Sequence, residues 1–126
     1  SCPSFPCPFE YIMVFAKESK KLLTQGETDL TKNEFSKWAY GIWTIAPETK
    51  MKKIGHPAVF PTELPLRLIK MLSWTNAKVL DPFCGSGSTG VACKLAGRKF
   101  IGIEMSDVYC DLSRNRIDNI EDNMFS

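Results

Sequence analysis

The most regular hydrophobic period in the chain begins at Pro61. Three leucines follow at intervals of four residues, with Ile69 beside them: Leu64, Leu68 and Leu72. This spacing places apolar side chains on one face, so it predicts an amphipathic helix that packs on a core. Proline suits the first turn of a helix, and Glu63 suits the positive end of the helix dipole.

Two short apolar runs follow, at 78–81 and 99–104, and each has the length and composition of a strand. Between them, residues 91–96 predict a short helix that Gly97 ends. A last helix is expected from Ser106, which suits an N-cap. Strand, loop, helix, strand and helix make a βαβ unit, so we expect an α/β protein with two parallel strands and a right-handed crossover.

The first 55 residues have a weaker pattern. Residues 10–17 are rich in β-branched and aromatic side chains, which predicts a strand buried on both faces. We expect its pairing partners to lie outside this chain, because nothing before it can supply one. From residue 18 to residue 55, lysines are interleaved with Trp38, Tyr40 and Trp43. This mixture fits nucleic-acid contact, and it fits a solvated loop whose tryptophans pack on the domain at least as well.

Composition limits the classes of protein to consider. The chain has 126 residues and a mass of 14.2 kDa, with 44% hydrophobic and 24% charged residues, which fits one small globular domain. A formal charge of +2 does not by itself indicate a nucleic-acid partner. No apolar run reaches the length of a membrane span. Five cysteines without a Cys-x-x-Cys pair, and His56 as the single histidine, argue against a zinc site and favour reduced thiols in a cytoplasmic protein.

The strongest chemical signal is the decapeptide at 81–90, Asp-Pro-Phe-Cys-Gly-Ser-Gly-Ser-Thr-Gly, which joins the first strand of the βαβ unit to its helix. Ligands of α/β sheets bind where strand ends meet a helix N-terminus. Gly85 and Gly87 allow the backbone to approach a ligand closely. Glu104 ends the next strand, where an acid can accept hydrogen bonds from two ribose hydroxyls. Together, Asp81 and Glu104 predict a ligand that contains a nucleoside.

Gly85, Gly87 and Gly90 also satisfy the pattern G-x-G-x-x-G of dinucleotide-binding proteins. Two features oppose that interpretation. Too few residues follow Gly90 for the remaining strands of a dinucleotide fold, and Asp81 places a negative charge where a pyrophosphate would approach. A carboxylate there suits a cationic group instead, such as an ammonium or a sulfonium. A nicotinamide-binding module is therefore our third hypothesis.

Residues 81–90 resemble motif I of the DNA amino-methyltransferases, which use S-adenosylmethionine to methylate adenine N6 or cytosine N4. Residues 100–106 resemble their motif II, residues 56–64 are similar to their motif X, and residues 10–17 resemble, more loosely, the strand of motif VIII. Further similarity lies in the stretch that closes many members: Tyr109, Arg116 and Ile117. The order of these motifs is that of the β group of the family.

The resemblance implies a partial Rossmann-like fold of the S-adenosylmethionine-dependent methyltransferases. It implies that residues 1–55 hold the motif VIII-like strand and a variable, target-recognition-like segment, and that residues 56–126 bind S-adenosylmethionine. By the same resemblance, Asp81 binds the methionine ammonium, Glu104 the ribose hydroxyls, and Met105 lies against the adenine. The other implied cofactor contacts are Phe60, Pro61, Phe83, Gly85, Ser86, Gly87 and Ser88.

The family's catalytic motif, Asp/Asn/Ser-Pro-Pro-aromatic, holds the target amino group and stacks on the flipped base. This sequence contains no Pro-Pro pair, so we predict no catalytic residue in it and expect it to be inactive alone. In the β group that motif lies upstream of motif VIII. The expected partners are double-stranded DNA and a missing N-terminal half or a second subunit. An excised fragment, a truncated reading frame and a split-enzyme subunit all fit.

Uncovered edges of such a sheet predict self-association, so a homo-oligomer is a further expectation. An alternative function is that of a non-catalytic DNA-binding or assembly module with a methyltransferase-like fold. The lysines and aromatic residues between residues 18 and 55 motivate this alternative.

Overall fold

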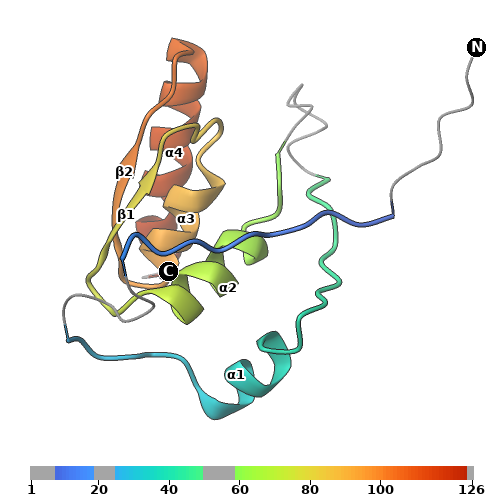
Figure 1. The fold of residues 1–126 in the computed structure, drawn as a ribbon. Coiled ribbons are helices and arrows are strands. Elements are labelled where there is room, and N and C mark those ends of the chain that lie inside the picture. Colours follow the sequence, from blue (N-terminus) through green and yellow to red (C-terminus); the bar gives the residue numbers. More distant parts are fainter. Residues whose placement is uncertain (1–7, 19–24, 50–58, 125–126) are drawn as a thin grey trace, which may run out of the picture.

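The computed structural model of the chain describes residues 8–18, 25–49 and 59–124 (Figure 1). The elements follow in the order α1 (Lys32–Trp38), α2 (Glu63–Leu72), β1 (Lys78–Asp81), α3 (Ser88–Leu95), β2 (Lys99–Gly102) and α4 (Asp107–Met124). None of the helices in this part of the chain is both long enough and apolar enough to cross a membrane. Cys2, Cys7 and His56 lie outside the described residues.

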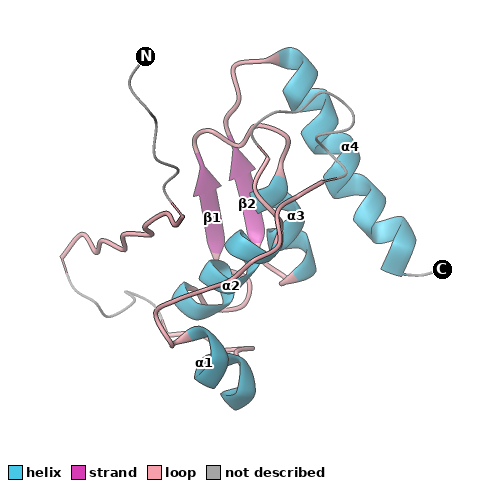
Figure 2. Ribbon diagram, turned by 90° about the vertical axis from the view of Figure 1, so that its right-hand side faces the viewer, coloured by secondary structure: helices cyan, strands magenta, loops and turns pink. Residues whose placement is uncertain are grey.

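The two strands lie side by side and parallel, as the βαβ pattern predicts (Figure 2). Their register pairs Lys78 with Lys99 at one end and Asp81 with Gly102 at the other. Pairing continues past β2, because the Ile103 amide donates to the Asp81 carbonyl at 2.9 Å. The carboxyl ends of both strands are thus held at one edge of the sheet, where the decapeptide begins.

The core lies where α2 and α3 pack on this sheet. Ala92 and Cys93 of α3 are completely buried, and Ile69 of α2 packs against them. Val79 and Phe100 reach the same cluster from the two strands. Small side chains on α3 allow it to approach the sheet closely, which is the arrangement of a Rossmann-like α/β fold. The helix at α2 and both strands are confirmed, although α3 begins at Ser88 rather than at residue 91, and β2 ends at Gly102, two residues before Glu104.

The predicted buried strand at residues 10–17 is wrong for this structure. Residues 8–18 have neither strand nor helix, and every one of them is exposed. The exposed fractions reach 82% at Tyr11 and 84% at Phe15. A strand needs neighbouring backbone to satisfy its N–H and C=O groups, and none of the described strands lies beside this segment. The apolar residues of this segment therefore do not take part in the described sheet.

Helix α1 was not expected, although its start carries a capping box. The Glu34 amide donates to Thr31 Oγ1 at 3.1 Å, and the Thr31 amide donates to Glu34 Oε2 at 2.9 Å. The Thr-x-x-Glu spacing could have revealed this helix from the sequence. Trp38 and Trp43 pack on Arg67 of α2, which agrees with the tryptophan packing of the loop alternative for residues 18–55, although Trp38 lies in a helix and not in a loop.

A buried arginine ties the segment at 25–49 to the βαβ unit. All five N–H groups of the Arg98 guanidinium find acceptors. Nη1 and Nη2 donate to the two carboxylate oxygens of Asp29 at 2.7 and 2.9 Å. The remaining contacts are with Ser73 Oγ and the Ser73 carbonyl, at 3.2 and 2.7 Å, and with the Ala96 carbonyl, at 2.6 Å. One side chain thus joins Asp29, the end of α2 and the end of α3.

Candidate functional site

The decapeptide turns sharply at the end of β1, and Asp81 closes the turn. Its Oδ1 accepts a hydrogen bond from the Phe83 amide at 3.0 Å, and its Oδ2 accepts one from Thr89 Oγ1 at 2.6 Å. The second bond joins the end of β1 to the first turn of α3. Thr89 was not among the predicted site residues, although it lies within the decapeptide. The Asp81 carboxylate is therefore fixed in orientation before any ligand is considered.

Glu104 holds the loop from the opposite strand. Its Oε2 accepts from the Gly85 amide at 2.9 Å, and its Oε1 accepts from the Ser106 amide at 3.0 Å. The hydrogen bond from the Ser106 amide lowers the pKa of this carboxyl below its ordinary value, and the bond from the Gly85 amide adds a smaller effect in the same direction. Glu104 is therefore ionised at neutral pH. The two acids lie at adjacent strand ends with the glycine loop between them, as expected from the sequence.

Two glycines have backbone conformations that side chains rarely adopt. Gly85 has φ +51° and Gly87 has φ +87°. At Gly87 a Cβ atom would also overlap the hydroxyl of Ser113 on α4. Glycine is therefore favoured by its backbone conformation at Gly85, whereas at Gly87 a side chain would also lack space.

Two buried serines of the loop face Arg116 of α4. Ser86 and Ser88 are 6% and 3% exposed. Arg116 Nη1 donates to the Ser86 carbonyl at 2.7 Å, to Ser86 Oγ at 3.0 Å and to Ser88 Oγ at 3.4 Å. Burial lowers the pKa of this guanidinium. Arg116 thus supports the loop from the side of α4, a role that its place in the sequence did not indicate. Contacts between the two serines and a ligand stay a prediction.

A cavity of about 290 Å³ lies beside the loop, between α2 and β1. Two of the predicted site residues, Phe60 and Asp81, line it together with Thr89. The apolar wall comes from α2, through Leu64, Pro65, Leu68 and Ile69. Pro61 follows Phe60 directly and is half-buried. An apolar pocket with one fixed carboxylate matches the usual make-up of a small-molecule site.

Phe83 and Met105 flank the strand ends without lining this cavity. They are 88% and 98% exposed. Large apolar side chains so exposed beside two acids are typical of a surface that another molecule covers. Burial raises the pKa of the nearby Cys84 thiol, and the negative charges of Asp81 and Glu104 raise it further. Cys84 is therefore protonated at neutral pH and unsuited to act as a nucleophile.

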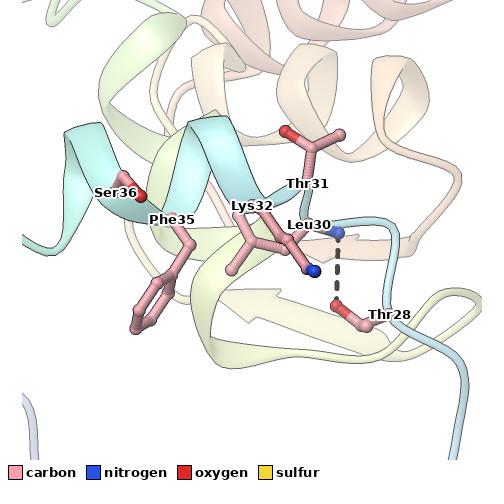
Figure 3. Close-up of a pocket in the computed structure, with 6 residues that line it drawn as sticks. All are labelled: Thr28, Leu30, Thr31, Lys32, Phe35 and Ser36. Atoms are coloured by element: carbon pink, nitrogen blue, oxygen red, sulfur yellow. Dashed lines mark hydrogen bonds between the residues drawn. The ribbon is translucent and has the colours of Figure 1, made fainter.

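A larger cavity, of about 410 Å³, lies at the start of α1 (Figure 3). Its lining is Thr28, Leu30, Thr31, Lys32, Phe35 and Ser36. None of the predicted site residues contributes to it. The smaller cavity is lined by Phe60 and Asp81, although Glu104 and the loop glycines do not line it, and these two residues make it the candidate site.

Comparisons with known proteins point to one family. A family model described as DNA methylase matches residues 2–115. The type II methyltransferase M.BglI of Bacillus subtilis is 40% identical over 111 residues, which cover 87% of this chain and 31% of that protein. The type II methyltransferase M2.DpnII of Streptococcus pneumoniae is 35% identical over 121 residues, which cover 94% of this chain and 45% of that protein.

Solved structures give the same result. A DNA modification methylase of Thermus thermophilus, solved in complex with S-adenosyl-L-methionine, is 33% identical with a TM-score of 0.61. The match covers 72% of this chain and 34% of that one. The matched region thus spans 31–45% of the length of these relatives. Because the family model covers most of the 126 residues and the fold agrees, the chain belongs to the DNA methylase family.

Proposed function

We propose that this chain forms the S-adenosylmethionine-binding part of a DNA methyltransferase that modifies adenine N6 or cytosine N4. The observation that carries the proposal is the pair of carboxylates, Asp81 and Glu104, at adjacent strand ends around the glycine loop. Membership of the DNA methylase family supports it. The S-adenosyl-L-methionine complex of the Thermus relative supports the choice of cofactor.

Glu104 is suited to hold the ribose of this cofactor. Each of its carboxylate oxygens accepts one backbone N–H, which leaves a lone pair on each oxygen for a hydroxyl donor. Its lowered pKa keeps it charged at neutral pH, and a charged acceptor makes the stronger hydrogen bond. Met105, next in the chain and 98% exposed, is free to lie against the adenine ring.

Asp81 is suited to hold the methionine ammonium, directly or through a water molecule. Thr89 and the Phe83 amide fix its carboxylate at the edge of the cavity that Phe60 also lines. Under this proposal Phe60 and Pro61 cover the methionine side. The other cofactor contacts in the proposal are Phe83, Gly85, Ser86, Gly87 and Ser88.

The cofactor supplies a methyl group made electrophilic by the sulfonium, and these residues bind and orient it. The Asp/Asn/Ser-Pro-Pro-aromatic motif that would hold the target base is not in the sequence. We propose that another stretch of polypeptide supplies it, either as more of the same chain or as a second subunit. Double-stranded DNA is the proposed substrate, and the cytoplasm is the proposed location. Residues 1–55 are the proposed target-recognition part, and residues 56–126 are the proposed cofactor-binding part.

Titration calorimetry of the 126-residue chain with S-adenosyl-L-methionine tests this proposal. We expect saturable binding that weakens roughly 10- to 100-fold in Glu104→Ala, because a hydrogen bond to a charged group contributes about 1.5–3 kcal/mol. Asp81→Ala should weaken it as well. Asp111→Ala is the matched control, since Asp111 is an exposed acid on α4, away from the loop. No binding at saturating cofactor, or equal binding by Glu104→Ala, contradicts the proposal.

A second candidate is a DNA-binding or assembly module without chemistry. It is favoured by the exposed Lys32 and Lys37 of α1, on either side of the exposed Phe35. Duplex binding that falls steeply with salt and ignores S-adenosyl-L-methionine would select this function. Duplex binding that strengthens with the cofactor would select the first.

A further inference from the structure

Helix α2 has two opposite faces with different tasks. One face carries the apolar residues that line the cavity beside Asp81, among them Leu64 and Leu68. The other carries a charged stripe of Glu63, Arg67 and Lys70, which the helical period places on one side. The stripe contacts the segment at 25–49 and not the sheet. Helix α2 is thus the wall that separates this segment from the candidate cofactor cavity.

Arg67 is held between two tryptophans of that segment. Its Cζ lies 5.7 Å from the ring centre of Trp38 and 5.4 Å from that of Trp43. Both distances fall within the range of cation–π attraction. The Trp43 indole N–H donates to the Trp38 carbonyl at 2.7 Å, which fixes the two tryptophans relative to each other. Glu63 pairs with Arg67 from the preceding turn of α2. The Arg67 side chain is 15% exposed, and its Nε and Nη2 both donate to Glu63 Oε1.

Lys70 adds a second attachment one turn further along α2. Its Nζ lies 2.6 Å from Glu34 Oε1 and 5.7 Å from the ring centre of Trp38. The hydrogen bond to Lys70, followed by that to Thr31, lowers the pKa of Glu34. Since Glu34 also completes the capping box of α1, the contact joins α1 to α2 as one unit.

The start of α2 carries the predicted cover of the cofactor. The Leu64 amide donates to the Pro61 carbonyl at 3.1 Å, so Phe60 and Pro61 follow the position of the helix. A shift of α2 would therefore move Phe60, Leu64 and Leu68 relative to Asp81, which is fixed separately by Thr89.

We propose that Arg67 is a positioning residue for cofactor binding, and that the 25–49 segment and the cofactor cavity are coupled through it. The proposal rests on the proposed function, because it takes the cavity beside Asp81 as the S-adenosylmethionine site. Any partner that displaces Trp38 and Trp43 then alters cofactor affinity, and the cofactor alters the affinity for that partner by the same factor.

Calorimetry with S-adenosyl-L-methionine on the 126-residue chain and three variants tests the proposal. Arg67→Met keeps the length of the side chain without its charge, and Arg67→Lys keeps the charge without the planar group. Arg114→Met is the matched control, since Arg114 pairs with Asp111 on the exposed side of α4. Affinities are compared at a temperature where circular dichroism finds each variant fully folded, so a loss of stability alone would leave them unchanged.

We expect Arg67→Met to bind roughly 3- to 10-fold more weakly, Arg67→Lys to fall between it and the unchanged chain, and Arg114→Met to bind normally. Folded Arg67→Met with unchanged affinity overturns the coupling while leaving the proposed function intact. Should Arg67→Met fail to fold, Arg67→Lys decides: weaker binding supports the coupling and equal binding overturns it. Failure of the unchanged chain to bind overturns the proposed function, and the coupling with it.

Discussion

The segment at 8–18 and the βαβ unit are both rich in β-branched and aromatic residues, yet only one of them folds into a sheet. In the βαβ unit, β1 and β2 satisfy each other, and α3 covers them within a stretch of 25 residues. Neither of the strands in the described part of the chain pairs with residues 8–18, which remain exposed throughout. An apolar pattern therefore predicts where a strand can form, whereas a strand forms only where backbone partners are present.

The segment at 25–49 is an intermediate case. It contains no strand, and it is held to the βαβ unit mainly by charged and aromatic side chains: Asp29, Glu34, Trp38 and Trp43. Its partners, Arg67, Lys70 and Arg98, all come from later in the chain. Side-chain contacts, together with a backbone hydrogen bond from the Thr75 amide to the Glu27 carbonyl at 2.9 Å, thus hold this segment without a strand.

The largest change is expected when the buried attachment of this segment is removed. Arg98→Met leaves Asp29 and the carbonyls of Ser73 and Ala96 without their donor. Each carbonyl left without a donor costs about 1–3 kcal/mol, and Asp29 adds less because its side chain is 32% exposed, so the sum is about 3–5 kcal/mol. Urea unfolding should therefore show a loss of that size, against about 0–1 kcal/mol for the exposed Arg114→Met. A loss below 1 kcal/mol for Arg98→Met would mean that the segment is held by other contacts.

A smaller loss is expected inside the βαβ unit at Gly90. A Cβ at this position would overlap Ile117 of α4 and lie 2.7 Å from the Phe100 ring. Overpacking of this kind costs about 1–3 kcal/mol, and the higher helix propensity of alanine within α3 offsets up to about 1 kcal/mol, so Gly90→Ala should lower the free energy of unfolding by about 1–2 kcal/mol. Asn115→Ala, at an exposed position on α4, is the control and should change it by about 0.5 kcal/mol or less. Equal values for the two variants would contradict this packing.

A weaker effect should appear on acidification. The hydrogen bond from Arg98 lowers the pKa of Asp29 below its ordinary value of 3.8. The folded state therefore binds this proton less readily than the unfolded state, so the contribution of Asp29 is complete above pH 3.8 and is lost as the pH falls further. Stability measured from about pH 5 to pH 3 should fall less steeply in Asp29→Asn. Parallel curves for the two proteins would show that Asp29 does not contribute.

The smallest effect on stability is expected in the segment at 8–18. Val14→Thr, at a side chain 63% exposed, should change the free energy of unfolding by about 0.5 kcal/mol or less. The same variant should reduce self-association in sedimentation velocity, because it removes apolar surface from an uncovered stretch. A loss above 1 kcal/mol would indicate that Val14 is packed. A monomeric unchanged chain would contradict the self-association.

Local chemistry explains how much of this fold was predictable. The leucine spacing identifies α2, the Asp81 decapeptide identifies the turn after β1, and Gly97, with φ +67°, ends α3 as expected. Each of these features depends on residues close together in the sequence. The capping box of α1 was equally local and was missed, although Phe35 and Trp38 follow it at helical spacing.

The supports of the site could not be predicted in the same way. Arg116 reaches Ser86 across 30 residues, and Arg98 reaches Asp29 across 69. The sequence around an arginine does not predict which distant carbonyl or carboxylate will accept its hydrogen bonds. The paired acids Asp81 and Glu104 were predictable because parallel strands bring their ends together whatever the details of packing.

The contact between Asp29 and Arg98 also sets an order of events during synthesis. Asp29 is made 69 residues before its partner. At a translation rate of about 5–20 residues per second, the carboxylate waits roughly 3–14 s for the guanidinium. The segment at 25–49 can meet Arg67 and Lys70 of α2 earlier, whereas its attachment through Arg98 forms only after the chain has been made as far as the start of β2.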